Sequence, residues 1–337
     1  MTDESLPVGP MIDDDEVAHA VAVLRGGGLV ALPTETVYGL GAAASNDDAV
    51  RRVFAVKGRP VDHPLIVHIA DADRLADWVD HVPPAARVLA SEFWPGPLTL
   101  LLGRGAHVSD VVTGGRPTVA VRVPAHPLTL AVLRAFGGGI AAPSANRFGK
   151  VSPTTAAHVR ADLGEDVDMV LDGGPCTVGV ESTIVDLTGA HPVVLRTGAI
   201  TAERLSEVLG VEVDRADDEP TPGPAGGARA PGMLESHYAP EACVHLVAAG
   251  EAVAVLTDLL AADEGLVGLL APGVMADAPD GVVELEPAGP PDDYAAVLYA
   301  RLRQADRLGL RHLVCVPPPA EGIGSAVIDR LRRASAS

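Results

Sequence analysis

The chain reads PTETVYGLG over residues 33–41, KGRP over 57–60, HPLIVHI over 63–69 and APSANRFGKVS over 142–152. These stretches hold the only two lysines of the sequence, Lys57 and Lys150, although it contains 25 Lys and Arg in all. A lysine ammonium is a compact charge that suits a phosphate group. The two lysines therefore mark both regions as candidates for an anion site. The alternative is that they are ordinary solvated side chains.

Apolar runs and helical periods alternate around these stretches. Their spacing predicts helices over 13–24, 47–56, 127–136 and 155–163, and buried strands over 29–32, 65–69, 98–102, 119–124, 140–142, 169–172, 182–186 and 193–196. Because the order is not a strict βαβ repeat, the pattern predicts an α+β fold with a mixed sheet. Alternation along the strand 119–124 places Arg122 on the face opposite Val121 and Val123.

The composition changes between residues 214 and 240, where proline and glycine cluster as in a linker. Beyond it, strands over 244–247, 267–270, 282–285 and 312–316 and helices over 294–308 and 323–334 predict a small parallel α/β domain. A length of 337 residues also favours two domains. We therefore predict a main domain over 11–213, a linker over 214–240 and a C-terminal α/β domain over 241–337.

Composition narrows the class of function. Apolar residues make up 47% of the chain and aromatic residues 3%, so the core must consist largely of Val, Leu and Ala. The formal net charge of −20 disfavours stable binding of RNA or DNA, because it repels a phosphate backbone. Three widely spaced cysteines give no CxxC and no zinc-site spacing, so we expect free thiols and no metal held by protein groups alone. Neither a signal peptide nor an apolar run of membrane-spanning length is present, and we expect a cytoplasmic protein.

Several standard catalytic motifs are absent, including the P-loop, the dinucleotide fingerprint and the GxSxG elbow. What remains is a set of cations and hydroxyls near predicted strand ends: Lys57, Arg59, Arg122, Lys150, Arg196, Thr34, Thr36, Thr118, Ser144, Ser152 and Ser182. Such a set suits an anionic small molecule, which fixed cations stabilise and hydroxyls orient. No nucleophile is evident, so catalysis would rest on positioning and electrostatics. The alternative is that each arginine caps a helix or pairs with one of the 45 acidic residues.

The quoted motifs, together with FWPGPLTL, TVAVRVP, ESTIVD and VLRTGAI, closely resemble the YrdC-like family over about residues 11–210. The linker motifs PGM and HYAP and the late EGIGSAVIDRLRRA are similar to the long form of that family, the L-threonylcarbamoyladenylate synthases. The resemblance implies a YrdC-like twisted mixed sheet with flanking helices, joined by a long linker to a smaller Rossmann-like α/β domain.

The resemblance also implies an activity and a site. Members of this family make threonylcarbamoyl-AMP from L-threonine, bicarbonate and ATP, releasing pyrophosphate, for the threonylcarbamoyladenosine modification of tRNA. The family's catalytic signature falls on Lys57, Arg59, Ser144 and Asn146. By similarity, ATP with magnesium is held by Lys57, Arg59, Thr118, Ser144, Ser152, Arg196 and Tyr238. Threonine lies against Thr34, His68, Arg122, Ala142 and Ser182.

The resemblance further implies that Tyr238, on the linker, belongs to a lid that excludes water from the reactive carbamate. A downstream tRNA threonylcarbamoyl transferase complex would receive the adenylate. Two alternatives remain open at this point. One is a related enzyme that makes carbamoyl-adenylate, although its acylphosphatase and zinc-finger regions are missing here. The other is a non-catalytic RNA-binding module, which the acidic charge disfavours.

Overall fold

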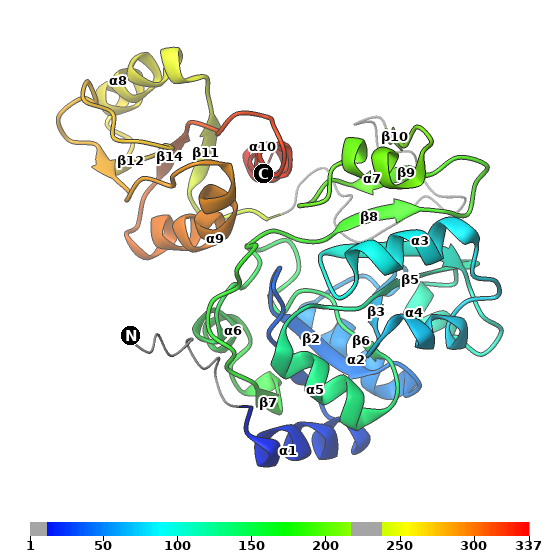
Figure 1. Ribbon diagram of the computed structural model, residues 1–337. Helices are drawn as coiled ribbons and strands as arrows, with labels where there is room; N and C mark the ends of the chain where they lie inside the picture. The colour runs from blue at the N-terminus through cyan, green and yellow to red at the C-terminus, as the bar shows by residue number, and fades with distance from the viewer. Residues whose placement is uncertain (1–11, 217–237, 337) are drawn as a thin grey trace, which may run out of the picture.

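The structure is a computed structural model that describes residues 12–216 and 238–336. Within these residues the chain forms a ten-stranded mixed sheet and a separate four-stranded parallel sheet (Figure 1). No helix of these two ranges combines the length and the apolar character needed to cross a membrane. The mixed sheet confirms the predicted fold class, and the second sheet confirms the predicted C-terminal α/β fold.

The ten strands of the large sheet follow the order β10-β9-β8-β4-β5-β3-β6-β2-β1-β7. Their bounds are β1 Val30–Leu32, β2 Gly39–Ala43, β3 Ile66–His68, β4 Leu98–Gly103, β5 Thr118–Arg122, β6 Ile140–Ala141, β7 Met169–Val170, β8 Thr183–Asp186, β9 Val193–Arg196 and β10 Asp214–Arg215. The neighbours β3 and β5 run parallel, with His68 paired to Arg122 at their carboxyl ends. This register places two predicted site residues side by side.

Helices flank the large sheet on both faces. They are α1 Asp14–Arg25, α2 Asp47–Lys57, α3 Pro84–Phe93, α4 Asp110–Thr113, α5 Pro127–Phe136, α6 Ala156–Leu163 and α7 Ala202–Leu209, with short 3₁₀ turns at Ala72–Asp77 and Gly164–Asp166. Residues of α2, α3, α4 and α7 join one core with Val67, Val121 and Val123 of the sheet. Helices α1 and α5 cover part of the opposite face. Because Val121 and Val123 are in the first core, the prediction that Arg122 faces the other way is confirmed.

The small sheet has the order β11-β14-β12-β13, with β11 Cys243–Leu246, β12 Val267–Leu270, β13 Val283–Glu284 and β14 His312–Cys315. Helices α9 Pro291–Arg307 and α10 Gly324–Ser335 pack on one face of it, and a short 3₁₀ turn Ala249–Glu251 leads into α8 Ala252–Ala262 on the other. Figure 1 shows α9 and α10 on the side of this sheet that faces the rest of the molecule, with α8 on the far side. All four strands and both later helices match the sequence prediction to within a few residues.

Several elements were missed or misassigned. Strand β2, Gly39–Ala43, was not predicted; it begins within the quoted stretch 33–41 and pairs with β1 and β6. Helices α3, α4, α7 and α8 were not predicted. Residues Asp214–Arg215, which the sequence assigned to the linker, form β10 and pair with β9. Residues 217–237 of the proposed linker, with its PGM motif and the histidine of HYAP, lie outside the described residues. The proposed domain boundaries stay a prediction.

Candidate functional site

Helices α1 and α5 cover only part of one face of the large sheet. Among the described residues, a pocket that includes Arg122 and Ala142 opens on the rest of that face. Its empty volume is about 560 Å³, including solvent at the mouth. Nine of the thirteen site residues that the resemblance implies line it: Thr34, Arg59, His68, Arg122, Ala142, Ser144, Ser182, Arg196 and Tyr238. They come from segments that lie far apart in the sequence, so the fold itself assembles the pocket.

The turn that ends α2 positions Arg59. The side chain of Asn46 caps the start of this helix, and Gly58 ends it with a φ of 64°. The Arg59 guanidinium is buried; it donates to the carbonyl of Pro64 (3.2 Å) and lies over the ring of Phe148 (5.8 Å). Burial lowers its pKa to about 10, a value at which the group remains charged at neutral pH. Arg59 therefore presents a poorly solvated cation to the pocket.

Arg196, at the end of β9, supplies a second cation. Its Nε and Nη2 atoms donate to the carbonyl and the hydroxyl of Ser182, each at 3.0 Å. Ser182 also shares a hydrogen bond of 2.7 Å with Thr99. Burial lowers the pKa of Arg196 as well. Two fixed arginines at one pocket can stabilise negative charge without reorganising, which is what a phosphate chain requires.

Arg122 is already partly engaged. Its Nη2 donates to the carboxylate of Glu35 at 2.7 Å, its Nη1 to the Thr36 hydroxyl at 3.0 Å and its Nε to the Gly96 carbonyl at 3.1 Å. A guanidinium has five N–H groups, so two remain for a ligand. Thr36, one of the hydroxyls proposed from the sequence, lines the pocket. Glu35 was not proposed for the site, although it belongs to the quoted PTETVYGLG motif.

His68 and Thr34 complete this part of the wall. Burial, with the nearby charge of Arg122, lowers the pKa of His68 to about 3, so its imidazole is neutral at pH 7. The Thr34 hydroxyl donates to the carbonyl of Val37 (2.6 Å) and accepts from the Val37 amide (3.1 Å). Thr34 therefore shapes the loop before β2 as well as lining the pocket.

The other four predicted residues do not line the pocket. Lys57 is buried behind the wall, where its ammonium donates to the backbone carbonyls of Ser144 and Asn146. Burial, with repulsion from Arg59, lowers its pKa well below the usual value. The Asn146 amide donates to the carbonyls of Arg147 (2.8 Å) and Lys150 (2.7 Å). Lys57 and Asn146 thus hold the loop that presents Ser144.

Ser152 and Thr118 also lie away from the pocket wall: Ser152 donates to Glu181, and Thr118 begins β5, paired with Gly103. Lys150, considered above as a phosphate contact, is exposed, and its ammonium lies 3.8 Å from Glu241. For Lys150 the alternative of an ordinary surface lysine is therefore the better description. The roles of the other predicted residues toward ATP and threonine stay predictions.

A buried ionic network, which the sequence did not predict, joins the pocket to the C-terminal helices. Glu181 accepts from Ser152 (2.7 Å), from the Tyr299 hydroxyl of α9 (2.8 Å) and from Arg330 of α10 (2.9 Å). Burial raises the pKa of Glu181, but the charges of Arg330 and Arg196 outweigh that effect and lower it to about 2. Glu181 lines the pocket and is ionised at neutral pH.

Tyr238 is packed between the same groups. Its ring stacks on Tyr299 at a centroid distance of 5.7 Å, and the Arg330 guanidinium lies over it at 5.1 Å. The next residue, Ala239, donates its amide to the carbonyl of Gly149 at 3.1 Å. The C-terminal helices therefore hold one wall of the pocket in place.

Comparison with known proteins agrees with this architecture. A family model described as telomere recombination, covering Sua5, YciO and YrdC proteins, matches residues 22–198, and one described as threonylcarbamoyl-AMP synthase, C-terminal domain, matches 200–336. The chain belongs to the Sua5/YrdC family. Its long-form relatives are threonylcarbamoyl-AMP synthases, which are enzymes of the nucleotidyltransferase type.

Relatives from this family match over nearly the whole chain. Threonylcarbamoyl-AMP synthase from Pyrococcus abyssi is 42% identical over 96% of this chain and 95% of its own length. The enzyme from Bacillus subtilis is 41% identical, with coverages of 96% and 94%. A crystal structure of P. abyssi Sua5 complexed with L-threonine matches with a TM-score of 0.88 and 40% identity, covering 97% of this chain and 96% of that one.

Proposed function

We propose that this chain makes L-threonylcarbamoyladenylate from L-threonine, bicarbonate and ATP, releasing pyrophosphate, for the threonylcarbamoyladenosine modification of tRNA. The observation that supports it best is the pairing of Arg59 and Arg196 in one pocket with Arg122, His68 and Thr34. The first pair suits the phosphates of a nucleotide, and the second group suits a small amino acid. The L-threonine complex of a 40%-identical relative supports the amino acid half.

The donors that Arg122 keeps for a ligand support a threonine site at one end of the pocket. The two N–H groups of Arg122 that remain after its contacts with Glu35, Thr36 and Gly96 suit the carboxylate of the amino acid. Because His68 is neutral, its imidazole can accept from or donate to the threonine hydroxyl. The apolar walls of Val37 and Ala142 leave room for the methyl group.

The phosphate end would act through charge. An N-carboxylate formed from threonine and bicarbonate attacks the α-phosphorus of ATP, and pyrophosphate leaves. Arg59 and Arg196 stabilise the charge that develops on the phosphate oxygens. Glu181, which lines the described pocket, and Glu35, which contacts the pocket residue Arg122, are both already paired with arginines. Magnesium would therefore enter as the ATP complex, bound by phosphate oxygens rather than by protein carboxylates.

The remaining residues would preorganise the site. Lys57 fixes the loop 144–146 from behind, so that Ser144 faces the nucleotide, and Tyr238 closes the pocket on the C-terminal side. A closed pocket protects the carbamate and the mixed anhydride from water. We place the reaction in the cytoplasm, where a tRNA threonylcarbamoyl transferase complex would take up the product. A chain of net charge −20 need not bind tRNA itself.

The test is pyrophosphate release from ATP at fixed magnesium, with and without L-threonine and bicarbonate. Release should require both co-substrates and fail with serine or with carbamoyl phosphate. Arg196→Met should lower kcat/KM by about 100-fold, the usual effect of removing one charge-stabilising donor. The matched control is Arg204→Met, an arginine on the surface of α7, which should retain full activity. ATP turnover that is indifferent to threonine would refute the proposal, and turnover driven by carbamoyl phosphate would favour the carbamoyl-adenylate alternative.

A further inference from the structure

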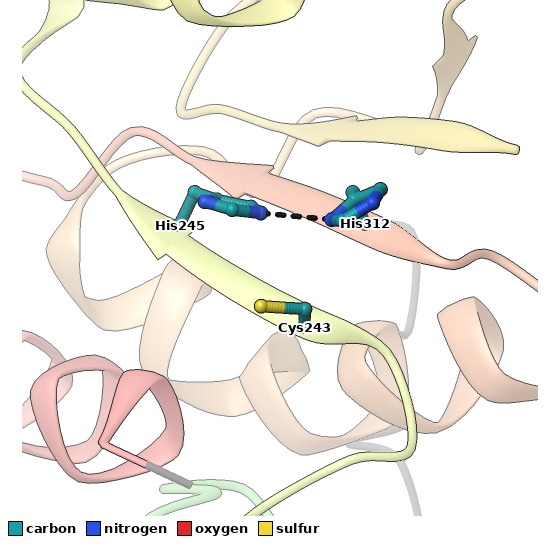
Figure 2. Close-up of side chains that lie close together, drawn as sticks. All are labelled: Cys243, His245 and His312. Atoms are coloured by element: carbon teal, nitrogen blue, oxygen red, sulfur yellow. Dashed lines mark hydrogen bonds between the residues drawn. The ribbon is translucent and has the colours of Figure 1, made fainter. Parts of the chain in front are cut away.

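Three side chains with metal-binding atoms meet at the edge of the small sheet, away from the pocket. Cys243 and His245 lie two residues apart on β11, so they point to the same face of the sheet. His312 begins the neighbouring strand β14 and is paired in register with Cys243. The Sγ atom and one ring nitrogen of each histidine in this Cys-His-His cluster all lie within 4.8 Å of one another (Figure 2).

The two imidazoles are directed at each other. His245 Nε2 and His312 Nδ1 lie 3.0 Å apart, and Figure 2 shows the contact as a dashed line. In a tetrahedral zinc site with Zn–N bonds of about 2.0–2.1 Å, two ligand nitrogens are separated by about 3.3 Å. A small opening of the pair would therefore let an ion replace the proton that the two rings share.

A carboxylate lies where it can orient one of the ligands. The Nε2 atom of His312 is 3.8 Å from the Glu264 carboxylate and has no hydrogen-bond partner among the described residues. A histidine that binds metal through one ring nitrogen usually directs the other to a carboxylate or a carbonyl group. Glu264 is the carboxylate that can take this place beside His312, which would leave the Nδ1 atom for a metal.

The cluster is accessible from solvent on one side. Cys243 is exposed, His245 is half-buried and His312 is buried. Helix α8 packs on β12 and β14, whereas β11 is the edge strand, so its outward face stays open at Cys243. Three protein ligands with solvent beside them leave a fourth coordination position for water or for another ligand.

We propose that Cys243, His245 and His312 form a binding site for a borderline-soft divalent cation of the zinc type, with one open coordination position. A thiolate and two imidazoles suit Zn²⁺ and do not suit Mg²⁺ or Ca²⁺, which prefer oxygen ligands. None of the three residues lines the pocket, so the site is separate from the proposed synthase chemistry. It goes beyond that function and does not depend on it.

The experiment uses the full chain, reduced and freed of metal by a chelator that is then removed. Titration with Co²⁺ should give one equivalent of a complex that shows a thiolate-to-cobalt charge-transfer band and intense tetrahedral d–d bands. Zn²⁺ should displace both. Cys243→Ser should abolish the charge-transfer band, and His245→Gln or His312→Gln should abolish the tetrahedral bands. Glu264→Gln should weaken the affinity for Zn²⁺ by roughly 10- to 100-fold.

Two control variants keep the test specific. His191→Gln removes an exposed histidine of the large domain, and Cys315→Ala removes a buried thiol on the other face of the same sheet. Both should bind Co²⁺ as the parent does. Threonine-dependent pyrophosphate release and far-ultraviolet circular dichroism should be unchanged in the three ligand variants. An absent cobalt spectrum, or a spectrum that persists in Cys243→Ser and His312→Gln, would show that the two histidines only hydrogen-bond to each other.

Discussion

Replacing Arg330 by methionine should destabilise the protein through Glu181. The two side chains are buried, with exposed fractions of 0% and 7%, and their ion pair measures 2.9 Å. Methionine keeps most of the aliphatic volume of arginine but leaves Glu181 without its main counter-charge. Losing one partner of a buried pair typically costs about 3–5 kcal/mol, because the other charge stays buried.

The pKa of Glu181 gives an independent magnitude. It falls from 4.5 to about 2, with the charge of Arg330 as the largest favourable cause after the opposing effect of burial. Since one pKa unit corresponds to about 1.4 kcal/mol, the favourable interactions of ionised Glu181 contribute on the order of 3 kcal/mol net of burial. We therefore expect Arg330→Met to lower the free energy of unfolding by about 3 kcal/mol at pH 7.

The assay is urea unfolding, followed by circular dichroism for the whole chain and by fluorescence of Trp78 and Trp94 for the large sheet. Arg332→Met, an exposed arginine on the same helix, is the control and should change the stability by less than about 0.5 kcal/mol. The double variant Arg330→Met with Glu181→Gln should cost at least about 1 kcal/mol less than the two single variants together. Additive costs, or equal effects of the Arg330 and Arg332 variants, would refute the ionic explanation.

Three further predictions concern stability and activity. His68 has a pKa of about 3 in the folded protein and about 6.5 in the unfolded chain, so the unfolded chain binds more protons and stability falls as the pH drops below 6.5. In His68→Gln the loss of unfolding free energy between pH 5.5 and 4.5, measured by urea unfolding, should be smaller by about 1.4 kcal/mol. An unchanged dependence of stability on pH would contradict the buried neutral imidazole. Gly179 and Gly174 share a φ of 79°, but a Cβ on Gly179 would lie 2.3 Å from the Ala295 carbonyl oxygen of α9, whereas one on Gly174 would meet nothing. Gly174→Ala should therefore lower the free energy of unfolding by roughly 1–2 kcal/mol through backbone strain alone, and Gly179→Ala by roughly 1–3 kcal/mol more through overpacking. Equal melting temperatures of the two variants would argue against close packing of α9 at this loop. Lys57→Met should leave two carbonyls without their donor, which should lower stability by about 1–3 kcal/mol and reduce pyrophosphate release. Lys150→Met, at the surface, should change neither stability nor pyrophosphate release. The reverse result would place Lys150 at the phosphates.

Much of the secondary structure could be predicted from local pattern. Helices α1, α2, α5, α9 and α10 keep their apolar residues to one face and were found, because a period of 3.6 residues is visible within one segment. Helix α8 was missed because its sequence, AVAVLTDLLAA, is apolar nearly all round and shows no such period. Helix α7 has a local signal in its sequence, the N-cap residue Thr201, from which its start can be predicted. Strand β2 could not be predicted, because its sequence, GLGAA, gives no strand alternation.

The sequence alone determined which residue types reach the pocket. Arginines and hydroxyls next to strand ends identify it, and alternation along one strand sets the face of Arg122. Only the tertiary structure decided their partners. Glu181 meets Arg330 across 149 positions and His245 meets His312 across 67, and no local period encodes pairings of that range. Strand register and helix packing bring those groups together, and burial then decides which of them carry charge.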